Sequence, residues 1–94
     1  MTKKLSIVRF KPKPEHFDEF IAAIKERNNG DTAMTEFKLM KTVTEVVVIG
    51  VRDPSVFDES VQLGVEWLDQ HRHMLQEYDP INRHTIPITG DLVE

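Results

Sequence analysis

The chain has 94 residues, 39% hydrophobic and 30% charged, which is ordinary for one globular domain spanning residues 1–94. It has no cysteine, which excludes disulfides and thiolate metal sites and fits a reducing compartment. Its net charge of −4 argues against a nucleic-acid partner, and no apolar run approaches membrane length. We therefore expect a soluble cytoplasmic protein that binds neither nucleic acid nor a membrane.

The N-terminal part predicts a strand followed by a helix. Leu5–Lys11 is rich in Ile, Val and Phe, as strands are, and Pro12 stops it because proline cannot donate to a strand ladder. Pro14 suits the first position of a helix, and Glu15–Arg27 then carries its apolar residues on one face. Asn28–Asp31 favours a turn and ends this helix.

Three further strands are predicted. Thr35–Lys41 alternates apolar and polar residues, which indicates a strand with one wetter face. Glu45–Arg52 is a nearly continuous β-branched run, typical of a central strand buried on both faces. Ile81–Ile88 predicts a last strand, with Pro87 at an edge position, and Asp91–Glu94 a short tail.

The longest helical pattern covers Asp53–Asp79. The side chain of Asp53 or Ser55 can accept hydrogen bonds from the first free N–H groups, which marks a helix start. Gly64 lies within the pattern, so one continuous helix and two shorter helices both remain open.

The apolar arc of this helix is wider than one sheet requires. Phe57, Val61, Leu68 and Leu75 recur at helical spacing along its middle. We expect this stripe to pack on a sheet, while a flank holding Trp67, His71 and Tyr78 faces a pocket or a second surface.

This order of elements is β-α-β-β-α-β. It predicts an α+β, ferredoxin-like fold, in which two helices cover one face of a four-stranded antiparallel sheet. The other face is left without intramolecular cover although its residues are substantially apolar. We therefore predict a homodimer with its sheets packed face to face.

Several segments bear a family resemblance. The strand and helix IVRFKPKPEHFDEFIAAI, followed by TEFKLMK and VVVIGVRD, resemble the small antibiotic-biosynthesis-monooxygenase-like (ABM-like) domains of the dimeric α+β barrel superfamily. The closing segments WLDQHRHMLQEYD and HTIPITGDLV resemble the end of one uncharacterised branch of these domains. The resemblance covers nearly the whole chain and implies the dimeric barrel.

The resemblance implies several activities. Such domains include cofactor-independent oxygenases of phenolic substrates, haem-degrading enzymes, isomerases, and members with no known activity. The haem-degrading branch uses a Trp and a His on the later helix, which Trp67 and His71 can match, but also an Asn that the first strand lacks. The leading hypothesis is a monooxygenase-like enzyme that acts on a small hydrophobic or aromatic molecule without a cofactor. The alternative is a non-catalytic ligand-binding or stress-response dimer.

Five residues are candidates for the site. Trp67 is either a wall for a flat substrate or a core residue, and His71 is either the catalytic base or a core histidine bonded to backbone. Arg9 is either a charge in a structural ion pair, since buried charges are normally paired, or it binds a Glu from the neighbouring subunit or an acidic substrate. Tyr78 and His84 are further candidate substrate contacts. No metal site is predicted, because the helical histidines His71 and His73 point to different sides.

Overall fold

The computed structural model describes residues 3–29, 34–81 and 83–93. Gly30, Asp31, Asn82 and Glu94 of the predicted segments lie outside the described residues, as do the side chains of Phe57 and Asp58. The elements, in chain order, are β1 (Lys4–Phe10), a 3-10 turn (Pro14–His16), α1 (Phe17–Asn29), β2 (Met34–Lys41), β3 (Val46–Arg52), α2 (Pro54–His71), a 3-10 turn (Arg72–Met74) and β4 (Thr85–Asp91).

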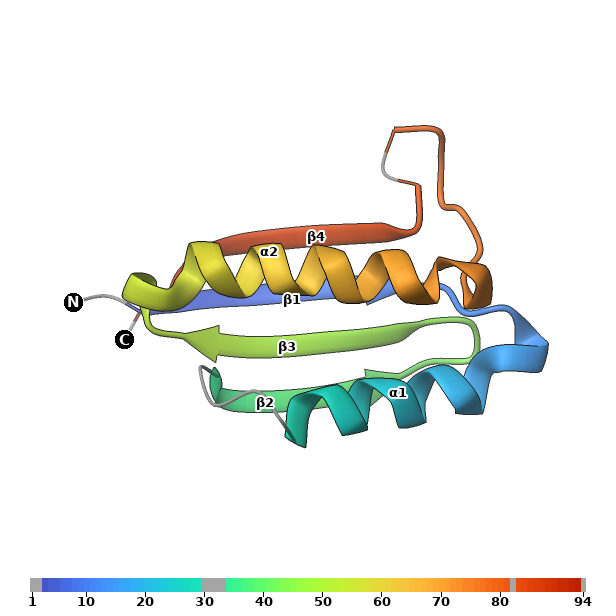
Figure 1. Ribbon diagram of the computed structural model, residues 1–94, viewed down its shortest axis with the longest axis horizontal. Helices are drawn as coiled ribbons and strands as arrows, with labels where there is room; N and C mark the ends of the chain where they lie inside the picture. Colours follow the sequence, from blue (N-terminus) through green and yellow to red (C-terminus); the bar gives the residue numbers. More distant parts are fainter. Residues whose placement is uncertain (1–2, 30–33, 82, 94) are drawn as a thin grey trace.

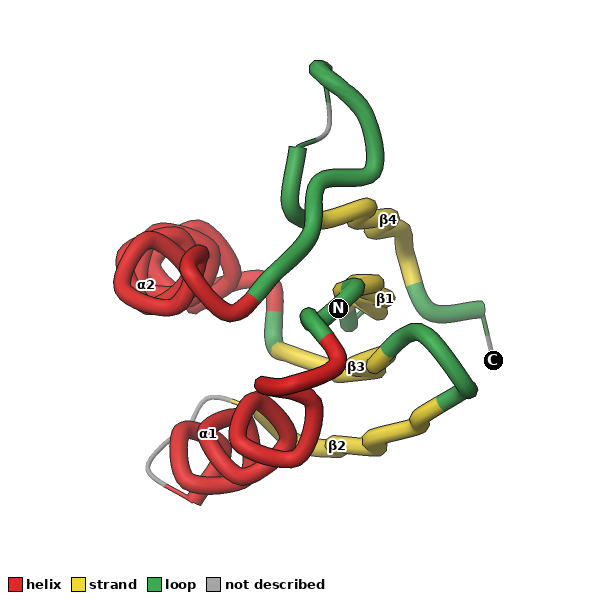
Figure 2. Tube along the Cα trace, turned by 90° about the vertical axis from the view of Figure 1, so that its right-hand side faces the viewer, coloured by secondary structure: helices red, strands yellow, loops and turns green. Residues whose placement is uncertain are grey.

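The four strands form one antiparallel sheet in the order β2-β3-β1-β4. Both helices lie on the same side of this sheet, and no helix covers its other side among the described residues (Figures 1 and 2). The ferredoxin-like β-α-β-β-α-β prediction is therefore confirmed. None of the helices described is long and apolar enough to span a membrane.

Helix α2 is continuous but shorter than predicted. Asp53 caps it by accepting a hydrogen bond of 2.9 Å from the backbone N–H of Ser55, as expected. The helix runs through Gly64 without a break and ends at His71, not at Asp79. It stops there because the chain turns at Arg72–Met74 and then pairs with another segment: Leu75 forms an antiparallel β-bridge with Pro12.

Strand β4 begins later and ends later than the predicted Ile81–Ile88. Before it, the backbone N–H of Tyr78 donates to the carbonyl of Arg83, and Arg83 has a positive φ of 58°. At the other end, the strand continues through Thr89 to Asp91, because these residues pair with β1. Pro87 lies on this edge strand, as predicted.

The main core lies between the sheet and the helices. Its buried members are Phe10, Phe20, Ile24, Val46, Leu68, Met74 and Leu75. On the opposite face of the sheet, most of the alternate positions of the strands are apolar as well, with Arg9 and Lys38 among the charged exceptions, and Ile88 there is exposed. The second apolar face anticipated from the sequence is thus present.

Candidate functional site

The register of the strands determines which side chains lie side by side on the helix-covered face, and these differ in size from one end of the sheet to the other. Residues that pair with one another across β3, β1 and β4 form rows that run across the sheet. From one end to the other, the rows are Ser6 with Gly50 and Thr89, Val8 with Val48 and Pro87, and Phe10 with Val46 and Thr85. The row with the smallest side chains lies where β1 begins. We call this half the hollow end and the half around Phe10 and Val46 the packed end.

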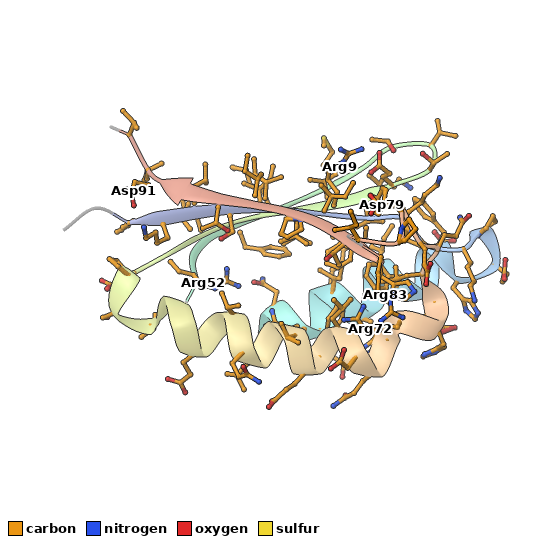
Figure 3. The ribbon with its side chains drawn as sticks, turned by 90° about the horizontal axis from the view of Figure 1, so that it is seen from above. Arg9, Arg52, Arg72, Asp79, Arg83 and Asp91 are labelled. Atoms are coloured by element: carbon orange, nitrogen blue, oxygen red, sulfur yellow. The ribbon has the colours of Figure 1, made fainter. Side chains whose placement is uncertain are left out.

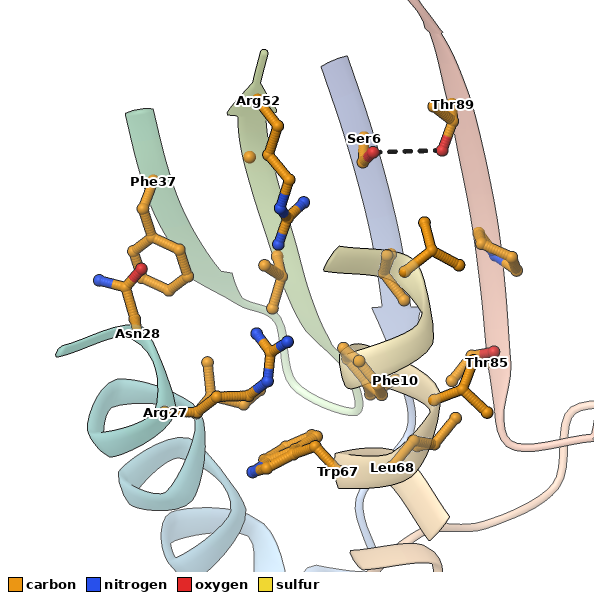
Figure 4. A pocket seen from close by; sticks show the side chains of 18 residues that line it. Ser6, Phe10, Arg27, Asn28, Phe37, Arg52, Trp67, Leu68, Thr85 and Thr89 are labelled. Carbon is orange, nitrogen blue, oxygen red and sulfur yellow. Dashed lines mark hydrogen bonds between the residues drawn. The ribbon is translucent and has the colours of Figure 1, made fainter. Parts of the chain in front are cut away.

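A cavity of about 240 Å³ lies between the sheet and the helices, with its small-residue row at the hollow end (Figure 4). Most of its wall is apolar, and its polar groups come from several elements. Its lining includes Ser6, Phe10, Arg27, Arg52, Gly64 and Trp67. A mostly apolar cavity with a few polar groups is the usual form of a small-molecule site.

Trp67 forms one wall of this cavity, at the border with the packed end. Its ring packs on Phe20, with centroids 5.7 Å apart, and stacks on His71, with centroids 4.3 Å apart and planes 23° from parallel. The guanidinium carbon of Arg27 lies 5.8 Å from the ring centroid, within cation–π range. These contacts fix the orientation of the indole.

His71 lies behind Trp67, outside the residues that line the cavity. Its Nδ1 is 2.8 Å from the carbonyl oxygen of Trp67. A carbonyl can only accept, so Nδ1 carries the proton and donates, and Nε2 is the nitrogen that can accept in the neutral ring. His71 therefore adjoins the site through Trp67, and its role as a base stays a prediction.

The charged groups of the cavity were not among the residues singled out from the sequence. Arg27 in the last turn of α1 and Arg52 at the end of β3 both line it, and Figure 4 shows their guanidinium groups pointing toward one another. In the sequence, both read as ordinary charges at the ends of elements. The available signal was Gly50, since a glycine inside a strand often marks a close approach or a gap.

Arg9 and Tyr78 lie together at a second place, away from the cavity. Figure 3 shows Arg9 on the side of the sheet opposite α2, with Arg52 between the sheet and the helix. Arg9 donates two hydrogen bonds of 3.0 Å to the carboxylate of Glu45, and the Tyr78 hydroxyl donates to the same group. The partner expected from a neighbouring subunit or a substrate is thus Glu45 of the same chain.

This cluster shifts the pKa of its members. The hydrogen bonds from Arg9 and then from Tyr78 lower the pKa of Glu45, because they favour its charged form. Burial, and then the bond to the Glu45 carboxylate, raise the pKa of the Tyr78 hydroxyl well above its ordinary value. Glu45 is therefore a carboxylate and Tyr78 a neutral phenol near pH 7.

His84 occupies a third place, just before β4. It is 8% exposed, and its Nδ1 lies 3.0 Å from Nη1 of Arg72. Because a guanidinium only donates, Nδ1 accepts, and the proton of the neutral ring is on Nε2. Burial and the charge of Arg72 lower the pKa of His84. His84 does not line the cavity, although its neighbour Thr85 does.

The five candidates therefore lie in three locations, and Trp67 is the member that lines the cavity. Roles of Arg9, Tyr78 and His84 in substrate binding stay predictions. Among the described residues, no group of three or more His, Asp or Glu side chains could hold a metal ion.

Solved structures share this architecture. A candidate antibiotic biosynthesis monooxygenase from Chloroflexus aurantiacus aligns over 99% of this chain and 95% of its own, with a TM-score of 0.74 and 13% identity. The chain has the ABM-like fold. A protein of unknown function from Nitrosomonas europaea aligns over 100% and 92%, with a TM-score of 0.73 and 17% identity. A protein from Mycobacterium tuberculosis aligns over 99% and 97%, with a TM-score of 0.74 and 14% identity.

The similarity to these solved structures is a similarity of fold. No protein-family model and no curated protein sequence matches the chain. The similar structures cover almost the whole domain at identities of 13–17%, which supports a shared fold and not a shared reaction. The cavity itself is therefore the feature of this chain that bears on its function.

Proposed function

We propose that the chain takes a small hydrophobic, aromatic molecule into the cavity beside Trp67 and oxidises it with O₂, without a bound cofactor. The observation that carries the proposal is the apolar cavity of about 240 Å³ with the indole of Trp67 as one wall. A flat ring against an indole gains stacking in addition to buried apolar area. The ABM-like fold is consistent with such a site, since one similar structure is a candidate monooxygenase.

The size of the cavity limits the ligand. Pockets for drug-sized molecules measure roughly 300–1,000 Å³, and the cavity here is about 240 Å³. A ligand of one or two fused rings fits this space, whereas a haem would need the helices to move apart. We therefore do not propose haem binding.

The proposed chemistry balances with O₂ as the oxidant. A phenol or enol loses its hydroxyl proton, and the resulting anion carries negative charge on the ring carbon that is CH₂ in the keto tautomer. This carbanion passes an electron to O₂. The radical pair combines to a peroxide, which loses water, so that CH₂ and O₂ become C=O and H₂O. His71 is the proposed base through Nε2, and this role requires the stacked Trp67–His71 pair to shift, because His71 lies behind the indole.

A non-catalytic ligand-binding protein is the second candidate. The observation that favours it is the make-up of the wall: none of the described residues that line the cavity is a His, Asp or Glu. A site without a proton acceptor can bind a phenol but has no group placed to ionise it. Binding and turnover therefore need separate measurements.

Binding is measured through Trp67, the only tryptophan of the chain. One- and two-ring phenols and quinols should change its fluorescence on binding, and Trp67→Phe should weaken binding as measured by calorimetry. Oxygen uptake with the same compounds then separates the two candidates. If His71→Phe abolishes oxygen uptake but keeps the stacking on Trp67 and the binding of the ligand, the enzyme is supported. Binding without uptake supports the binding protein, and absence of binding overturns both.

We also propose that a second copy of this chain covers the exposed face of the sheet. Ile7 lies at the centre of that face, between Ile49 on β3 and Ile88 on β4. Burying such a face stabilises association, because apolar area leaves water. Ile7→Lys should convert the dimer into a monomer in sedimentation equilibrium. Leu63→Lys, on the exposed surface of α2, is the control that should leave the dimer unchanged. A wild-type monomer would contradict the proposal.

A further inference from the structure

The cavity has an unusual charge for this protein. The chain as a whole carries a net charge of −4. Yet the described residues that line the cavity include Arg27 and Arg52 and no acidic residue. The two arginines come from different elements, the end of α1 and the end of β3, and converge on one side of the space (Figure 4). A mostly apolar wall surrounds these two guanidinium groups.

Contacts with α2 help to place the guanidinium group of Arg27. Its central carbon lies 5.8 Å from the centroid of the Trp67 ring. One turn earlier on the same helix is Gly64, where a Cβ atom would stand 3.6 Å from Nη2 of Arg27. The missing side chain of Gly64 therefore leaves room into which the guanidinium extends. A residue larger than alanine there would compete with Arg27 for this space.

A guanidinium can serve a ligand whatever else it contacts. Each one offers five N–H donors in a planar fork, which is enough for more than one acceptor. The fork matches the spacing of the two oxygens of a carboxylate, and charge-assisted bonds of this kind are stronger than neutral ones. Apolar surroundings strengthen the attraction further, because they screen charge less than water does.

We propose that the ligand carries an oxyanion conjugated to its aromatic ring, either a carboxylate or an ionised hydroxyl, and that Arg27 and Arg52 bind this group. The inference rests on the proposed function, since it names the class of molecule that enters the same cavity. The oxyanion lies between the guanidinium groups, and the ring lies against Trp67 and Phe10. The Ser6 and Thr89 hydroxyls lie 3.2 Å apart and bond to each other. This part of the cavity wall is therefore less polar than the part formed by the two arginines.

This binding mode also bears on the chemistry. Two positive charges beside a bound phenol or enol favour its ionised form and so lower the pKa of the ligand. The ionised form is the electron-rich species that can pass an electron to O₂. The arginines would thus favour ionisation of the ligand by electrostatics, whereas a base would bring it about by accepting the proton. The described residues that line the cavity include no His, Asp or Glu that could act as such a base.

A pair of matched probes tests the charge requirement. We would titrate 2-naphthoate and 2-naphthamide into the wild-type protein at pH 7 by calorimetry, with Trp67 fluorescence as the report of location. The two probes have the same shape and differ in charge. Because a hydrogen bond to a charged group is worth more than a neutral one, naphthoate should bind at least about tenfold more tightly.

Variants then locate the source of the preference. Arg52→Gln and Arg27→Gln should each bring the ratio of the two affinities toward one, mainly by weakening naphthoate. Lys25→Gln is the control, because it removes the same charge from an exposed position of α1 two residues from Arg27. Thermal unfolding of each variant establishes that it is folded.

The outcomes separate the two proposals. Equal binding of both probes by the wild type overturns the inference and leaves the proposed function standing, and it needs no variant. A preference for naphthoate that survives in both arginine variants also overturns the inference, because the charge is then recognised elsewhere. Failure of both probes and of neutral phenols to bind overturns the proposed function, and the inference with it.

Discussion

The two ends of the space beneath the helices differ in how they are filled. At the packed end, the rings of Phe10 and Phe20 lie 5.0 Å apart, and Val46 and Phe20 are fully buried. At the hollow end, the same strands contribute Ser6 and Gly50, and a cavity remains. The pairing of β1 with β3 and β4 is in regular register at both ends, so side-chain size along these strands determines where the protein is solid and where it can admit a ligand.

The ends also differ in how they are tied together. Around the packed end, the backbone of the segment after α2 bonds to the segment after β1: Lys13 N–H donates to Met74 and Gln76 N–H donates to Lys11, both at 2.8 Å. At the hollow end, a single backbone bond of this kind, from the N–H of Leu92 to the carbonyl of Lys3 at 2.8 Å, stands among those described, and Lys4 and Asp91 form an ion pair of 2.6 Å. Exposed ion pairs contribute little to stability. Opening the hollow end should therefore disturb less of the structure than opening the packed end.

The largest expected effect comes from removing the centre of the packed end. Phe20 is 0% exposed and contacts both Phe10 and Trp67. Phe20→Ala should lower the free energy of unfolding by about 3–5 kcal/mol in urea titrations, because it leaves a cavity in a filled core. Val61→Ala is the matched control at the hollow end, where Val61 is 47% exposed. It should cost less than about 1 kcal/mol. Equal losses would contradict the difference between the ends.

A smaller effect is expected from the hydrogen bonds that hold the approach to β4. The Tyr78 hydroxyl donates to Glu45, which also binds Arg9. Tyr78→Phe should destabilise the protein by about 1 kcal/mol, at the low end for a bond to a charged group because the site is partly exposed. Ligand binding in the cavity should be unchanged, since Tyr78 lies elsewhere. A loss of binding without a loss of stability would instead give Tyr78 the substrate contact predicted from sequence.

At the hollow end, a substitution in α2 should be favourable. Gly64 lies in the middle of the helix, where glycine costs about 0.5–1 kcal/mol relative to alanine, and an added Cβ meets Arg27 at an ordinary contact distance of 3.6 Å. Gly64→Ala should therefore raise the free energy of unfolding by up to that amount. Gly64→Leu should stay folded but lose the ligand, because its side chain fills the cavity. Unchanged ligand binding in Gly64→Leu would show that the ligand binds elsewhere.

The sequence was sufficient for the fold, because alternation and proline positions are local signals. The strand Glu45–Arg52 and the edge position of Pro87 were predicted from such signals and are present. The ends of α2 and β4 were not, since they depend on pairing between distant segments: Leu75 with Pro12, and Asp91 with Lys4. A local pattern in the sequence does not show that a segment will pair with another segment more than sixty residues away.

The site was predicted in part for the same reason. Trp67 stands out as the only tryptophan, and it lines the cavity. The hollow beside it exists because Ser6, Gly50 and Thr89 fall in one row, which is a property of strand register. Arg27 and Arg52 approach one another only after α1 has packed against the sheet. Charges at the ends of elements are usually solvated, so nothing in the sequence distinguishes these two arginines from surface residues.

The smallest effect is a dependence of stability on pH at the end of α2. His84 is buried beside Arg72, and burial and this charge lower its pKa. The folded protein therefore holds His84 neutral, while the unfolded chain takes up a proton near pH 6.5. Between the lowered pKa and pH 6.5 the unfolded state binds more protons, so stability should fall as the pH falls through this window. Glu77 opposes the shift, and Arg83 and Lys13 add to it.

His84→Gln isolates this contribution, because glutamine offers Arg72 an acceptor but does not titrate. Urea unfolding at several pH values between 5 and 8 should give a shallower dependence in the variant than in the wild type. His73→Gln is the control, since it makes the same substitution at an exposed histidine. An equal slope in both variants would mean that His84 titrates alike in the folded and unfolded states. Arg72 would then donate its hydrogen bond to His84 without affecting the protonation of the ring.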